Sequence, residues 1–104
     1  MIKVKLIKNN NHIKKIIIKG HAMYADYGKD IVCASASAIV ITSINACLRI
    51  NKESIKYKEE KDKLTIDIIS KDKDVLLIIE NMMSMLEELA KTYQKNIKII
   101  KEEK

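Results

Sequence analysis

Residues 2–19 of the chain read IKVKLIKNNNHIKKIIIK. Apolar and polar side chains alternate along residues 2–8, and this period of two predicts a strand with one buried face. Residues 13–19 predict a second strand, and the polar segment 9–12 predicts the turn between them. Two strands joined by a short polar turn form an antiparallel hairpin, so we expect the chain to begin with one.

A helix is predicted from Ile31 to about Ile50, after a loop over residues 20–29. Asp30 precedes this helix as a typical N-cap, whose carboxylate accepts hydrogen bonds from the free backbone N–H groups of the first turn. Residues at spacings of three and four predict the face that packs on the sheet. That predicted face consists of Ala34, Ala38, Ile41, Asn45 and Leu48.

The second half of the chain predicts the same order of elements. Residues 54–59 and 63–70 predict another hairpin, a second helix follows from about Asp72 to Tyr93, and residues 96–101 predict a closing strand. The buried stripe expected on this helix is Val75, Ile78, Ile79, Met82, Leu86, Leu89 and Tyr93. Further apolar positions broaden the stripe, which fits either a dimer contact or a deeply buried helix: Leu76, Leu77, Met83 and Met85.

The element order is therefore β-β-α-β-β-α-β. We expect an α+β fold, similar to an α/β sandwich, in which a mixed or antiparallel sheet carries two helices on one face. The 104 residues suit a single domain over 1–104, and two glycines without any proline leave little room for linkers.

The compartment expected for the chain is the cytoplasm. The N-terminus alternates apolar residues with lysine and lacks the apolar core of a secretory signal. The apolar runs fall short of the roughly 20 residues of a membrane span, so no membrane contact is expected. Two cysteines at unrelated positions do not make a disulfide framework, which favours reduced thiols.

The net charge of +6 is concentrated at one end of the sequence. Residues 1–25 contain six lysines and no acid, whereas the remaining residues contain 14 basic and 14 acidic side chains. One interpretation is a contact with ribosomal RNA or a ribonucleoprotein. The other is a solvated sheet face whose lysines prevent edge-to-edge aggregation, and no aromatic or arginine-rich motif decides for RNA.

Cys33 is the third residue of the first predicted helix. Free backbone N–H groups and the helix dipole favour a thiolate there, and a thiolate is the nucleophilic form of cysteine. The charge of Asp30 opposes this effect if it lies close. The alternative interpretation of Cys33 is a small buried core residue.

His21 lies at the end of the second predicted strand, directly after Gly20, which allows the chain to turn. Its imidazole accepts and returns a proton near neutral pH, as a general base does. The alternative interpretation is an ordinary polar loop residue. A loop that folds back would bring His21 beside Cys33.

A zinc site or a disulfide is not expected. Cys33 and Cys47 lie 14 positions apart on one predicted helix, which corresponds to about 21 Å. One zinc ion cannot reach both thiols at ligand distances near 2 Å, and a disulfide cannot join them while the helix is intact. Cys47 is expected in the core and His12 on the surface, and no metal or cofactor is expected.

One segment resembles the signature of the ribosomal-processing cysteine protease (Prp) family. The resemblance rests on Gly20-His21-Ala22, on Gly28-x-Asp30-Ile31-Val32-Cys33-Ala34, and on Ser37. It implies a small α/β fold, usually a homodimer, and removal of an N-terminal extension from a large-subunit ribosomal protein. The small residues after Cys33 (Ala-Ser-Ala-Ser) differ from what the family often has, which affects the pocket more than the chemistry.

The resemblance implies acyl transfer by a thiol. Cys33 is the implied nucleophile and His21 the general base, with supporting or substrate-binding positions at Gly20, Ala22, Gly28, Asp30, Ala34 and Ser37. The alternative is a non-catalytic ribosome-associated or RNA-associated module that uses the basic hairpin.

Overall fold

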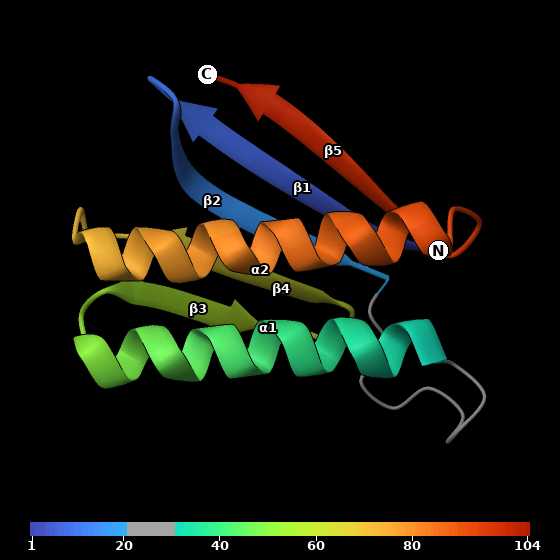
Figure 1. The fold of residues 1–104 in the computed structure, drawn as a ribbon, viewed down its shortest axis with the longest axis horizontal. Coiled ribbons are helices and arrows are strands. Elements are labelled where there is room, and N and C mark those ends of the chain that lie inside the picture. Colours follow the sequence, from blue (N-terminus) through green and yellow to red (C-terminus); the bar gives the residue numbers. More distant parts are fainter. Residues whose placement is uncertain (21–30) are drawn as a thin grey trace.

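The computed structural model describes residues 1–20 and 31–104. Its elements follow the predicted order, which confirms the fold class (Figure 1). The hairpin consists of β1 (Ile2–Asn9) and β2 (His12–Lys19), and α1 (Ile31–Ile50) follows. The second half comprises β3 (Ile55–Glu59), β4 (Lys63–Ile68), α2 (Lys73–Thr92) and β5 (Ile97–Glu103).

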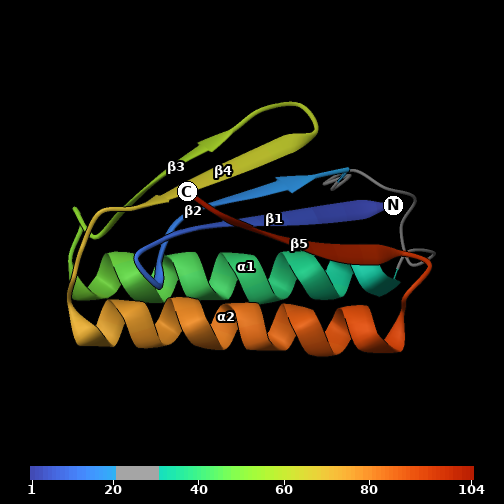
Figure 2. The ribbon, with the colours of Figure 1, turned by 90° about the horizontal axis from the view of Figure 1, so that it is seen from above.

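The five strands form one mixed sheet in the order β3-β4-β2-β1-β5. Adjacent strands are antiparallel except β1 and β5, which are parallel because α2 connects β4 to the opposite edge of the sheet. Both helices cover the same face of the sheet (Figure 2). They run antiparallel and pack against each other, with α2 also contacting β5 and α1 contacting β3.

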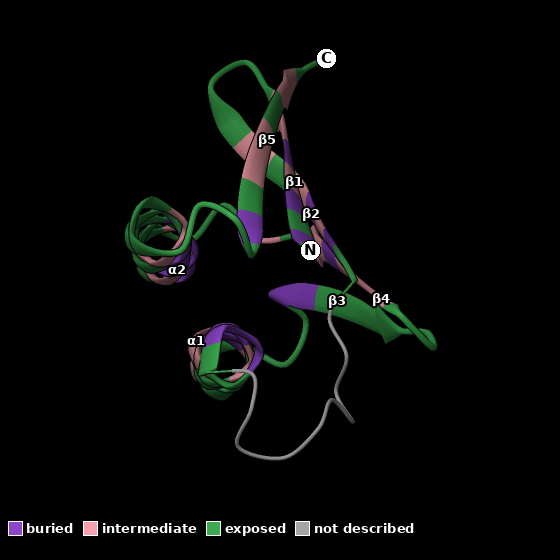
Figure 3. Cartoon of the chain, turned by 90° about the vertical axis from the view of Figure 1, so that its right-hand side faces the viewer, coloured by how far each residue is buried: buried purple, intermediate pink, exposed green. Residues whose placement is uncertain are grey.

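The core lies between the sheet and the helices (Figure 3). Strand alternation supplies the sheet side of this core, because Val4, Leu6, Ile16 and Ile18 are buried while their strand neighbours are less so. The turn between β1 and β2 places Asn10 and Asn11 at φ angles of 53° and 64°. Two-residue hairpin turns require such left-handed angles, and asparagine tolerates them better than most residues.

The predicted buried face of the first helix is wrong. Ala34, Ala38, Ile41 and Asn45 are exposed, and of that set Leu48 alone packs partly against the core. Apolar and small residues surround α1, so spacings of three and four can be drawn through more than one face. The face that is buried consists of Val32, Cys33, Ala36, Val40, Ser43, Ile44 and Cys47.

By length and composition, α1 is also apolar enough to cross a membrane. Its continuous apolar runs are nevertheless short, because serines and an asparagine interrupt them. A core helix meets the same criterion, and the seven buried residues of α1 are consistent with one.

The predicted stripe of α2 is largely confirmed. Val75, Ile79, Met82 and Leu86 are buried, and Ile78 and Leu89 pack partly against the core. Tyr93 is the exception, because it follows the last helical residue as the C-cap and is 37% exposed. Of the additional apolar positions, Met83 is buried and Leu76 half-buried, whereas two are exposed: Leu77 and Met85.

The burial pattern of α2 predicts that a leucine-to-alanine substitution lowers the free energy of unfolding by different amounts at two positions. Leu86→Ala removes a fully buried side chain and should lower the free energy of unfolding by about 2–5 kcal/mol. Leu77→Ala, on the same helix at 65% exposure, should change it by less than about 0.5 kcal/mol. Urea denaturation of both variants measures the difference, and equal losses would contradict this packing.

Candidate active site

Gly20 follows the last residue of β2, at the point where the sequence predicts that the chain turns. Its φ angle is 74°, and a Cβ atom at this position would collide with the carbonyl oxygen of Met1. Its N–H donates a 3.1 Å hydrogen bond to the carbonyl of Asp62. Glycine is required here for both conformation and space, so the chain leaves β2 at a fixed point next to the N-terminus.

Cys33 is the third residue of α1, as predicted, and lies on its buried face with 4% of its surface exposed. The helix begins at Ile31, so the backbone N–H groups of this turn lie ahead of the regular i to i−4 hydrogen bonds. Among the described residues, no acidic side chain lies in this first turn. The helix dipole at this turn favours the thiolate form of Cys33, whereas the burial of the side chain favours the neutral thiol.

Four of the predicted site residues lie outside the described residues: His21, Ala22, Gly28 and Asp30. Their predicted roles, and the contact between His21 and Cys33, stay predictions. The described parts of the structure do bring the flanks of this segment to one end of the molecule, where the end of β2 and the start of α1 both lie (Figure 1).

Ser37 follows Cys33 by one helical turn and is half-buried. It lines a pocket of about 170 Å³ between α1 and the β3-β4 hairpin. Apolar side chains form most of its wall, and Asn45 and Glu59 add polar groups: the other lining residues are Val40, Ile41, Ile44, Tyr57 and Leu64. Ala34 is exposed, so the structure separates it from the buried face that carries Cys33.

Sequence reasoning missed the contribution of the β3-β4 hairpin to this pocket. Tyr57 lies on the edge strand β3 and is 52% exposed. The sequence signal for this position is the aromatic side chain in Lys56-Tyr57-Lys58, because edge strands more often carry charged side chains.

Cys47 lies in the core, as predicted, and Cys33 lies on the same buried face of α1. The side chain of Cys47 is fully buried, and burial raises the pKa of the Cys47 thiol above its usual value. Its carbonyl accepts a 2.9 Å hydrogen bond from the buried hydroxyl of Ser54, which ties the end of α1 to the start of β3. Cys47 is therefore a core residue, and it forms no disulfide bond with Cys33.

No group of three or more His, Cys, Asp or Glu side chains in residues 1–20 and 31–104 is arranged to hold a metal ion. His12, at the start of β2, is exposed as predicted. At the end of the molecule where α1 starts, the groups that the structure describes are therefore the Cys33 thiol, the first turn of α1 and the pocket beside Ser37.

Known proteins resemble this chain over most of its length. The family model "Cysteine protease Prp" matches residues 1–98. The ribosomal processing cysteine protease Prp of Staphylococcus aureus is 32% identical over 96 residues, which cover 89% of this chain and 91% of the relative. Its namesake from Bacillus subtilis is 30% identical over 101 residues, covering 86% and 88% of the two chains.

Solved structures show the same similarity over the whole chain. The S. aureus protease Prp in complex with a covalently linked product peptide superposes with a TM-score of 0.88 at 28% identity, covering 98% of this chain and 100% of that one. Its complex with a substrate peptide gives a TM-score of 0.87 at 27% identity, with the same coverage. Because the family model matches residues 1–98 and both named relatives are at least 30% identical over most of their length, the chain belongs to the Prp family of cysteine proteases.

Proposed function

We propose that this peptidase removes the N-terminal extension of a large-subunit ribosomal protein, with Cys33 as its nucleophile and His21 as its general base. The observation that carries the proposal is the position of Cys33 in the first turn of α1. The relatives that act in ribosomal processing, and the two S. aureus complexes with peptides, support the substrate class. The family's peptidase activity argues against a non-catalytic module.

The chemistry proceeds by acyl transfer. The Cys33 thiolate attacks the scissile carbonyl carbon, a carbon–sulfur bond forms, and the carbonyl oxygen becomes an oxyanion. Backbone N–H groups at the start of α1 donate hydrogen bonds to this oxyanion. His21, which has taken the proton of the Cys33 thiol, gives it to the departing amine as the carbon–nitrogen bond breaks. Water, deprotonated by His21, then hydrolyses the thioester and restores the thiol.

Supporting roles follow from position. Gly20 fixes the point at which the chain leaves β2, immediately before His21. Asp30 caps α1 or orients His21, Ala22 and Gly28 shape the surroundings of the thiol, and the exposed Ala34 is a supporting or substrate-binding position. Ser37 and its pocket face the substrate peptide beyond Cys33. We also propose that the protein acts in the cytoplasm and as a homodimer, for which the exposed side chains of Ile31, Ile41 and Met85 offer apolar surface.

Replacing the proposed nucleophile tests the assignment directly. Cys33→Ser keeps the size of the side chain but substitutes a poorly ionised hydroxyl, so cleavage should fall by more than about 10³-fold. Mass spectrometry of the peptide released from the extended ribosomal protein measures the rate. Cys47→Ala is the matched control, and it should lower stability while leaving the rate of the folded enzyme within about twofold. Cleavage by Cys33→Ser at the wild-type rate would eliminate the proposal.

The pH dependence of alkylation separates the two thiols. In the Cys47→Ala background, Cys33 should react with iodoacetamide with an apparent pKa below about 8.5, because the helix terminus stabilises its thiolate. In the Cys33→Ser background, burial raises the pKa of the Cys47 thiol, so its alkylation should rise only at a pH above that at which an ordinary thiol reacts. Mass-spectrometric rates between pH 5 and 10 measure both profiles. An apparent pKa of Cys33 at or above about 8.5 would show that its thiol is not activated.

Replacing His21 tests the proposed base. His21→Gln keeps a polar side chain but cannot exchange a proton near neutral pH, so kcat should fall by about 10²–10⁴-fold. The substitution should change kcat more than KM. The part of the wild-type pH–rate profile that reflects a group titrating near pH 6–7 should disappear in the variant. Steady-state kinetics on a substrate peptide measures both quantities, and an unchanged pH profile would remove His21 from the mechanism.

A further inference from the structure

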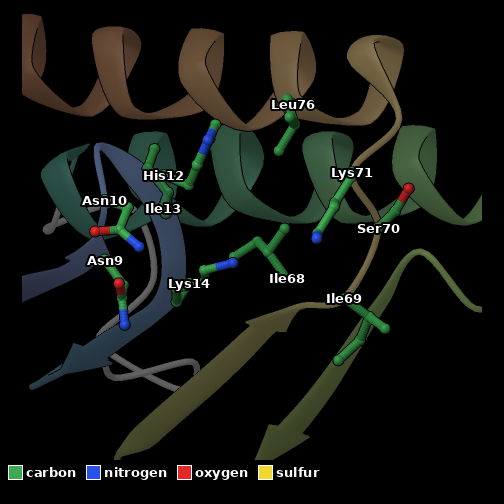
Figure 4. Close-up of a pocket in the computed structure, with 10 residues that line it drawn as sticks. All are labelled: Asn9, Asn10, His12, Ile13, Lys14, Ile68, Ile69, Ser70, Lys71 and Leu76. Atoms are coloured by element: carbon green, nitrogen blue, oxygen red, sulfur yellow. The ribbon is translucent and has the colours of Figure 1, made fainter. Parts of the chain in front are cut away.

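A second pocket lies beside the turn between β1 and β2. This turn is at the opposite end of the molecule from the start of α1 (Figure 1). The pocket has a volume of about 430 Å³ and is bounded by the hairpin turn, by the segment that follows β4, and by the first turns of α2. Its polar lining comes from Asn9, Asn10, His12, Lys14, Ser70 and Lys71 (Figure 4).

The path of the backbone explains why a pocket forms here. Pairing between β2 and β4 ends at Lys15 and Asp67. Beyond that point the N–H groups of Ile69 and Ser70 both donate 2.9 Å hydrogen bonds to the carbonyl of Ser54. These bonds draw the chain toward the start of β3 and away from the hairpin turn, which leaves a gap between two segments of the same sheet.

Two irregularities in the hairpin place polar groups at this gap. The register of β1 and β2 shifts between Ile7 and Lys8, so that Lys14 has no partner residue on β1. A bulge of this kind redirects a side chain. The left-handed turn contributes the second irregularity, and it holds Asn10 at the rim of the pocket. Lys14 and Lys71 reach into the pocket from opposite sides, with Ile68 between them (Figure 4).

The charges around the pocket are unbalanced. Lys5 and Lys15 of the hairpin form ion pairs with Glu102 and Asp67, at 3.2 and 3.5 Å. Lys14 and Lys71, by contrast, form no ion pair with any of the described residues, and no acidic side chain lines the pocket. The nearby carboxylate of Asp72 accepts a hydrogen bond from the N–H of Asp74, as the N-cap of α2.

We propose that this pocket binds the backbone of a single-stranded nucleic acid. The two ammonium groups contact phosphates, the asparagine amides and His12 donate to phosphate or ribose oxygens, and an apolar floor contacts the sugar and base: Ile13, Ile68 and Leu76. Both lysines are exposed, so each attracts a phosphate weakly and in competition with salt. Useful affinity then requires several linked phosphates, which favours a strand over a free phosphate ion.

Fluorescence anisotropy of a labelled 12-nucleotide oligouridylate, titrated with the full chain between 50 and 200 mM NaCl, tests this proposal. Lys14→Gln/Lys71→Gln should weaken binding at least tenfold at 50 mM NaCl. It should also reduce the slope of log K against log salt by about 1.4, since each phosphate that a lysine neutralises on a single strand contributes about 0.7 to that slope. Cleavage of a substrate peptide by this variant should stay within twofold of the wild-type rate.

The matched control is Lys95→Gln/Lys98→Gln, which removes the same charge from exposed positions next to the start of β5, at the other end of the sheet. It should weaken binding less than threefold. Equal losses in the two double variants, or no binding by the wild type at 50 mM NaCl, would overturn the proposal. Displacement of the oligonucleotide by 10 mM inorganic phosphate at constant ionic strength would instead identify a free-anion site. Loss of peptide cleavage in the pocket variant would assign the pocket to the substrate peptide.

Discussion

The burial of one face of α1 against α2 and the sheet is the constraint on which the rest of the structure depends. This face carries Val40, Ile44 and Cys47 along its length and Cys33 at its start. Because the same contact that fixes the helix also holds Cys33, the thiol and the backbone N–H groups of the first turn keep a constant relation to each other. In the proposed mechanism, a nucleophile and an oxyanion site on one helix require little reorganisation during the reaction.

The two ends of the molecule differ in what they can do. One end combines the start of α1, the glycine that terminates β2, and the apolar pocket beside Ser37. The other end combines the bulged hairpin with two lysines that form no ion pair among the described residues. The positive charge of the hairpin is divided between these ends, because Lys14 lies beside the turn whereas Lys3 and Lys19 pair where β2 ends.

The sequence predicted the strands and the element order well because lysines alternate with apolar residues, so that only one face of each strand can be buried. The same logic succeeded for most of α2, whose opposite face is charged. It failed for α1, where Ala34, Ala38 and Ile41 mark an exposed face. When a helix is apolar on all sides, its buried face is decided by the partners it meets, and periodicity alone does not contain that information.

The candidate site also combines features that the sequence predicts with features that depend on tertiary contacts. Spacing from the helix start placed Cys33 in the first turn of α1, and the burial of Cys47 follows from its position on the packed face. The pocket formed with Tyr57 and Leu64 depends on how the β3-β4 hairpin lies over α1, which is a tertiary contact between residues distant in sequence. The bulge at Lys14 likewise depends on strand register, which local residue preferences do not determine.

The central claim is that Cys33 carries the acyl group during cleavage. The most direct measurement is rapid acid quenching of the enzyme during turnover of a substrate peptide, followed by proteolytic digestion and tandem mass spectrometry. The account predicts a thioester between the acyl portion of the substrate and Cys33, which disappears as product accumulates. An acyl group on Cys47 or on any other residue, or sustained turnover without an adduct on Cys33 under conditions that trap thioesters, would contradict it.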